Sequence, residues 1–93
     1  MLANMVILKD RLSDIIEPDF GLLDHLLWLE VLSRRQYENI LSESGAAYMR
    51  SEALLKLLET EEQCNKFLNA LRRTGQQHVA NFIMQNGGWL LSD

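Results

Sequence analysis

Apolar residues recur along the chain at spacings of three and four, which is the pattern of one buried helix face. The first apolar stripe contains Met5, Leu8, Leu12, Ile15 and Ile16. Pro18 is expected to end this helix, because helical geometry is disfavoured at the residue before a proline. The second stripe contains Leu22, Leu23, Leu26 and Leu27. Asp19 is a candidate N-terminal cap for this second helix.

Two capping boxes predict the starts of a third and a fifth helix. Ser33 stands three residues before Gln36, and Thr60 stands three residues before Gln63. In each pair the hydroxyl can accept from the later backbone amide while the glutamine reaches back. The third helix is expected to bury Tyr37, Ile40 and Leu41, and the fifth to bury Cys64, Phe67, Leu68 and Leu71. Gly75 can end the fifth helix in a left-handed conformation.

A fourth and a sixth helix complete the pattern. The fourth follows a predicted loop at residues 42–45 and carries Met49, Ala53, Leu54, Leu57 and Leu58. The sixth carries Val79, Phe82 and Ile83 and is expected to stop at the glycine pair Gly87-Gly88, after Asn86. We therefore expect one domain over residues 1–86 and a tail or the start of a linker over residues 87–93.

Helices of about ten to fourteen residues are too short to be stable alone in water. They must bury their stripes against one another, and short connections favour antiparallel neighbours in an all-α bundle. The predicted core consists of Leu12, Ile16, Leu23, Leu27, Leu54, Leu58, Phe67, Leu68, Leu71 and Phe82.

Composition agrees with one globular domain. The chain has 93 residues, of which 47% are hydrophobic and 24% charged, and this balance argues against intrinsic disorder. No run approaches the roughly 18 apolar residues of a membrane span. The apolar start lacks a basic region before it and makes a poor signal peptide. We expect a location in the cytosol or nucleus, and no contact with a membrane.

The formal net charge is −4, and its excess of acid lies in the first third of the chain. Residues 1–32 contain six acidic and two basic side chains, whereas the rest of the chain is balanced. Acidic surfaces repel phosphate, so nucleic-acid binding is disfavoured. The acidic region is interpreted either as an ordinary solvated face or as a surface for a partner protein.

Catalytic and metal chemistry find little support. Cys64 could pair with His25 or His78 as nucleophile and base, but it lies on the apolar stripe of the fifth helix and is expected to be an inert core thiol. No motif for a phosphate loop, a calcium loop or a zinc protease is present. We expect no enzyme, no cofactor and no metal.

Three other side chains have open roles. Arg34 and Arg35 begin the third helix, so a helix-turn-helix DNA-binding domain is a possible interpretation, against which the acidic first third weighs. Trp28 lies beside a stripe that leucines already fill. It is either packed in the core or an anchor for a partner, because tryptophan is enriched at interface hot spots.

Several segments resemble the caspase recruitment domain (CARD) family in the family's own order. LLDHLL at 22–27 and VLSRRQYE at 31–38 resemble the region of its second and third helices. ALLKLL at 53–58 is similar to the fourth helix, FLNALRRTG at 67–75 to the fifth, and residues 78–83 to the sixth. The resemblance implies the death fold, a Greek-key bundle of six antiparallel helices whose first helix is often bent, and the sequence is compatible with a bend around Leu8-Lys9-Asp10.

The resemblance also implies a function in homotypic CARD–CARD association. Such domains bring procaspases, adaptors, receptors or kinases into apoptotic, inflammasome or NF-κB complexes in the cytoplasm, and some form homo-oligomers. Their best-known contact joins an acidic surface on the second and third helices to a basic surface on the first and fourth. By this resemblance the acidic face is Asp24, Glu30 and Glu38, and the basic side is Lys9, Arg11, Arg50 and Lys56.

Two features complicate this assignment. Arg34 and Arg35 lie within the would-be acidic surface, and Glu52 dilutes the basic side. The charge excess favours the acidic face. A pyrin or death-effector domain, which shares the death fold, is the main alternative to a CARD.

Overall fold

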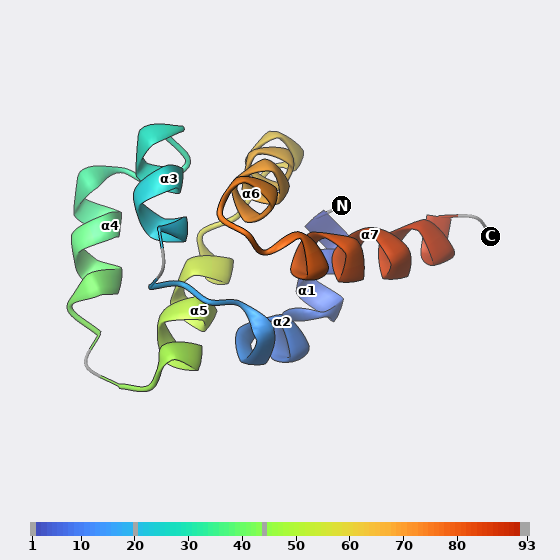
Figure 1. Cartoon of the computed structure of the whole chain (residues 1–93), viewed down its shortest axis with the longest axis horizontal. Coiled ribbons are helices and arrows are strands. Elements are labelled where there is room, and N and C mark those ends of the chain that lie inside the picture. Colours follow the sequence, from blue (N-terminus) through green and yellow to red (C-terminus); the bar gives the residue numbers. More distant parts are fainter. Residues whose placement is uncertain (1, 20, 44, 92–93) are drawn as a thin grey trace.

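The described part of the chain forms seven helices, and Figure 1 shows how they are arranged. The structure, a computed structural model, describes residues 2–19, 21–43 and 45–91, and places side chains in the last stretch up to residue 85. The helices are α1 (Leu2–Ile7), α2 (Lys9–Ile15), α3 (Leu22–Trp28), α4 (Arg34–Leu41), α5 (Ala47–Lys56), α6 (Glu61–Arg73) and α7 (Gln77–Leu91). No strand occurs in these stretches, and the predicted all-α fold is confirmed.

The predicted first helix is divided at Leu8 into α1 and α2. The break is a bend, because backbone bonding continues across it. The Leu8 amide donates to the Asn4 carbonyl at 2.9 Å, and the Leu12 amide donates to the Leu8 carbonyl at 2.9 Å. Seven helices instead of six therefore reflect the bent first helix that the CARD resemblance implies.

Both predicted capping boxes are confirmed. The Ser33 hydroxyl accepts from the Gln36 amide at 3.1 Å, and the Gln36 side chain accepts from the Ser33 amide at 2.9 Å. Thr60 and Gln63 exchange the same two bonds, each of 3.1 Å. Gly75 adopts a left-handed φ of 81° after α6, as predicted.

Two predicted helix boundaries are wrong, the start of α3 and the end of α7. Asp19 does not cap α3; the cap position is Gly21, at φ 95° and without a side-chain hydrogen bond, and Asp19 binds Arg50 instead. The last helix does not stop at the glycine pair, since α7 continues to Leu91. A glycine inside a helix costs only about 1 kcal/mol relative to alanine, so it does not force a stop. Ser44 of the predicted loop and the end of the predicted tail, Ser92 and Asp93, lie outside the described residues.

One apolar core joins all seven helices. The predicted core residues are buried except for Leu27 and Phe82, and Cys64 is also buried. Phe82 is partly buried and packs against the core. Leu27 lies at its margin, because α3 is only two turns long and its inward side is filled by Leu22, Leu23 and Leu26.

The packing places α3 and α4 at one end of the molecule. α2 packs chiefly on α5, α3 packs on both α4 and α6, and α6 packs on α7. Figure 1 shows α3 and α4 side by side at one end of the long axis and α7 at the other. The predicted acidic surface thus lies on α3 and α4 and the predicted basic side on α2 and α5, and α5 also packs on α4.

Candidate interaction surface

The acidic face (Asp24, Glu30 and Glu38) spans α3, the turn after it and α4. All three side chains are exposed. In the part of the chain that the structure describes, no lysine or arginine forms an ion pair with any of them. The face therefore presents three carboxylates without an ion-pair partner, with Arg34 and Arg35 exposed beside them at the start of α4.

Tyr37 holds Asp24 in place. Its hydroxyl donates a hydrogen bond to the Asp24 carboxylate and so links α4 to α3. This bond, followed by partial burial, raises the pKa of Tyr37 above its ordinary value, because ionisation would destroy the bond and leave two anions side by side. The sequence pattern placed Tyr37 on the inward stripe of its helix and gave no signal for this contact.

A cleft of about 130 Å³ adjoins Asp24. It is lined by Pro18, Asp19, Gly21, Leu23, Asp24, Tyr37 and Leu41. Both oxygens of the Asp19 carboxylate accept from Arg50, so the carboxylate that the cleft offers to a partner is that of Asp24. Apolar side chains beside this carboxylate suit the aliphatic stem and charged end of a basic side chain. The prediction that Leu41 is buried is wrong, since it is 49% exposed and lines this cleft. Asp19, predicted as a helix cap, lines the cleft as well.

Glu30 occupies an unusual backbone position. It is the only residue other than glycine with a positive φ, 63°, in the described part of the chain. The turn is a Schellman motif, in which the Val31 amide donates to the Leu26 carbonyl at 3.0 Å and the Glu30 amide donates to the Leu27 carbonyl at 3.1 Å. Glycine is the usual residue at this position, so Glu30 is retained there at a conformational cost.

Trp28 is exposed rather than packed in the core. Its exposed fraction is 76%, the largest among the exposed large hydrophobic side chains that the structure describes. The indole is tilted by 34° against the ring of His25, with the ring centroids 5.9 Å apart. Of the two roles left open by the sequence, the surface role fits this exposure.

Of the basic side, the structure brings together Lys9 and Lys56. They line one cleft of about 210 Å³ with Leu2, Met5, Val6, Leu55 and Leu58. Lys56 lies 3.5 Å from the Glu52 carboxylate on its own helix. Arg11 is exposed on α2 and does not line this cleft.

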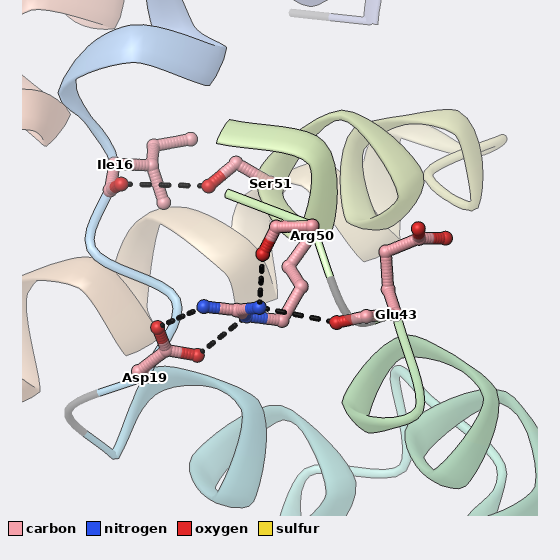
Figure 2. A network of polar contacts seen from close by, with 6 residues as sticks. Ile16, Asp19, Glu43, Arg50 and Ser51 are labelled. Carbon is pink, nitrogen blue, oxygen red and sulfur yellow. Dashed lines mark hydrogen bonds and ion pairs between the residues drawn. The ribbon is translucent and has the colours of Figure 1, made fainter. Parts of the chain in front are cut away.

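Arg50 is engaged inside the fold, as Figure 2 shows. Its guanidinium donates to both Asp19 carboxylate oxygens, at 2.8 and 2.7 Å. It also donates to the backbone carbonyls of Glu43 and Gly45, at 3.1 and 3.0 Å. Beside it the Ser51 hydroxyl donates to the Ile16 carbonyl at 3.4 Å. The Arg50 side chain is only 19% exposed. It joins α5 to the α2–α3 loop through Asp19 and to the α4–α5 loop through the two carbonyls.

The described residues offer little for other chemistry. They contain no group of three histidine, cysteine or acidic side chains arranged to hold a metal. Burial and the nearby Glu61 charge raise the pKa of the Cys64 thiol, which disfavours the reactive thiolate. Among these residues no helix has both the length and the apolar character needed to cross a membrane.

Comparison with known proteins identifies the family. The model of the caspase recruitment domain matches residues 8–86, which include the whole of α2 to α6 and most of α7. No curated protein and no solved structure matches the chain significantly. CARDs are interaction domains rather than catalytic ones, and they bind other CARD-containing proteins. With its all-helical fold and bent first helix, this chain belongs to the caspase recruitment domain family.

Proposed function

We propose that this CARD recruits a CARD-containing procaspase, adaptor, receptor or kinase to an apoptotic or inflammatory complex in the cytoplasm, and that it binds through the acidic face. The observation that carries the proposal is that three exposed carboxylates on α3, α4 and the turn between them lack a paired cation in the described residues. Charges that the fold leaves uncompensated are available to a partner.

The partner is a CARD with arginine or lysine side chains on its first and fourth helices. Such side chains would make charge-assisted hydrogen bonds to Asp24, Glu30 and Glu38. One of them fits the cleft beside Asp24, where the apolar lining accepts its stem. Contacts of this kind increase the association rate and the specificity more than the affinity, and they weaken as salt screens the charges.

The Lys9–Lys56 cleft supports a second role in self-association. It is lined by residues of α1, the start of α2 and the end of α5 and by no residue of the acidic face, so one copy can offer this cleft to the acidic face of the next. Contacts between two different surfaces of identical chains build rings or open helical assemblies. Homo-oligomers of this kind are a secondary proposal, because Arg50 is not available to strengthen the basic side.

The test is charge reversal on the acidic face. Asp24→Arg and Glu38→Arg should each abolish binding to a panel of CARDs with basic first and fourth helices, measured by biolayer interferometry. Asp14→Arg is the matched control, since Asp14 is exposed on α2, away from the acidic face, and it should bind as wild type does. Exposed substitutions such as Glu38→Arg and Asp14→Arg shift stability by about 0.5 kcal/mol or less. Asp24→Arg also loses the Tyr37 bond, but one hydrogen bond is a small part of a domain's stability, so thermal unfolding should still show folded variants throughout.

The control for complementarity is a compensating change. An acidic substitution at the matching partner residue should restore part of the binding to Asp24→Arg. Wild-type binding by both reversed variants would refute the acidic face as the recruiting surface. Lys9→Glu and Lys56→Glu would then be the variants that locate the contact.

A further inference from the structure

Trp28 is an exposed apolar side chain that lies in the chain between two residues of the acidic face, Asp24 and Glu30. Asp24 lies one helical turn before it, and residues four apart share one side of a helix. Glu30 follows two residues after it in the left-handed turn. An indole 76% exposed thus lies between two unpaired carboxylates in the chain.

The surroundings of Trp28 leave the ring accessible and oriented. The His25 ring lies beside it at a centroid separation of 5.9 Å and a tilt of 34°, which gives the indole one neighbour on its own helix. Most of the remaining ring surface is exposed. A large aromatic side chain held at the surface of a small domain is typical of a binding hot spot.

We propose that Trp28 makes the acidic face selective for arginine over lysine: a guanidinium on the partner's helix stacks on the indole while the flanking carboxylates of Asp24 and Glu30 bind its N–H groups. The inference rests on the proposed function of the acidic face and names the partner residue that this face recognises. It assigns Trp28 a role in specificity that charge alone does not provide.

The chemistry of the two cations explains the selectivity. The guanidinium is planar and weakly hydrated, so it can stack on an aromatic ring and still donate in its plane to carboxylates. The ammonium of lysine is compact and strongly hydrated, and it gains less from an indole. Tryptophan is the aromatic side chain that attracts cations most strongly. Carboxylates alone would attract either cation, whereas carboxylates around an indole favour arginine.

The experiment uses three dye-labelled alanine-based helical peptides as probes. Two positions four residues apart are both arginine in the first, both lysine in the second and both glutamine in the third. Fluorescence anisotropy at low salt measures their binding to the full chain. Wild type should bind the arginine peptide about two- to five-fold more tightly than the lysine peptide, the range set by cation–π contacts at exposed sites, and should bind the glutamine peptide least.

Variants separate the indole from the charge. Trp28→Ala should reduce the arginine-to-lysine affinity ratio to about one, because the cation–π contact that creates the preference is lost. Both basic peptides should still bind. Trp28→Phe should keep part of the preference. Tyr48→Ala is the matched control, because Tyr48 is also an exposed aromatic residue, 51% exposed and on α5, and it should leave the ratio unchanged.

Asp24→Asn separates the proposed role of Trp28 from the proposed role of the acidic face. If it weakens both basic peptides but wild type shows no preference for arginine, the role of Trp28 is refuted and the acidic face stands. If the preference survives Trp28→Ala, the role of Trp28 is also refuted. If Asp24→Asn leaves both peptides bound as before, or wild type binds neither peptide, the acidic face itself is refuted.

Discussion

The acidic face and the basic side differ in what the fold does with their charges. On the acidic face, Glu30 and Glu38 point to solvent without a paired cation among the described residues, and Asp24 is held only by a neutral hydroxyl. On the basic side, Arg50 is bound by one carboxylate and two carbonyls, and Lys56 lies near Glu52. The sequence alone shows similar numbers of charges on both.

This difference teaches that a charged residue is available to a partner only where the fold does not use it. Arg50 has a structural role, because it connects α5 to Asp19 in the α2–α3 loop and to the α4–α5 loop. On α3, α4 and the turn between them, by contrast, the fold binds none of the three carboxylates of the acidic face in an ion pair among the described residues. The basic side is reduced to Lys9, Arg11 and a partly engaged Lys56.

Truncation of the shared core should have the largest effect, because it removes both surfaces together. Phe67 is fully buried in α6, and Phe67→Ala should lower the free energy of unfolding by about 3–5 kcal/mol. Denaturant titration followed by circular dichroism measures this change. Leu41→Ala, at a side chain 49% exposed, is the control and should cost about 0.5 kcal/mol or less. Equal midpoints for the two variants would contradict the core.

Removal of the Arg50 guanidinium should have the next largest effect on stability. Arg50→Met keeps the aliphatic stem but leaves Asp19 and two carbonyls without their donor, so the melting temperature should fall by several degrees. Arg11→Met removes an exposed arginine and should leave the melting temperature unchanged. If both variants melt alike, Arg50 is an ordinary surface charge and the contrast between the two surfaces fails.

Interactions that are local in the chain were predictable from the sequence. Both capping boxes and most of the core stripes follow from spacings of three and four residues, and they occur in the structure as predicted. The same local patterns carried the family resemblance, which the family match confirms. Nearly the whole fold therefore follows from residues that lie within one or two helical turns of each other.

Contacts between distant residues were not predictable. Asp19 and Arg50 are separated by 31 positions and Asp24 and Tyr37 by 13, and no periodicity signals such pairs. The predicted role of Asp19 as a cap was wrong for this reason, and the sequence contained no sign that Arg50, assigned to the basic side, binds Asp19. Trp28 stayed ambiguous because α3 is too short for its stripe to define a side.

Glu30→Gly should separate function from stability at the acidic face. Glycine adopts the left-handed conformation without the steric cost that it has for other residues. The free energy of unfolding of this variant should therefore rise by about 1 kcal/mol. Partner binding should nevertheless weaken, because a carboxylate is lost. Glu30→Gln keeps the conformational cost and should weaken binding without the gain in stability. Unchanged binding by Glu30→Gly would remove Glu30 from the proposed contact.

The smallest expected effect is a shift in the titration of Tyr37. Because its hydroxyl donates to Asp24, the pKa of Tyr37 in the folded chain lies above its ordinary value, which is about 10 in unfolded chains. The stability that this bond contributes is thus complete below pH of about 10 and is lost as pH rises through the folded pKa. The acidic face should consequently loosen only in alkali.

Tyrosinate absorbance can follow this titration in the Tyr48→Phe variant, where Tyr37 is the remaining tyrosine of the two in the chain. Adding Asp24→Asn should move the midpoint down towards the ordinary value, because an amide oxygen is a weaker acceptor and carries no charge to oppose ionisation. The double variant should also lose the stability decrease in alkali that belongs to the Tyr37–Asp24 bond. An unchanged midpoint would mean that Asp24 is not held by Tyr37, and that the acidic face, unlike the Arg50 network, has no fixed geometry to offer a partner.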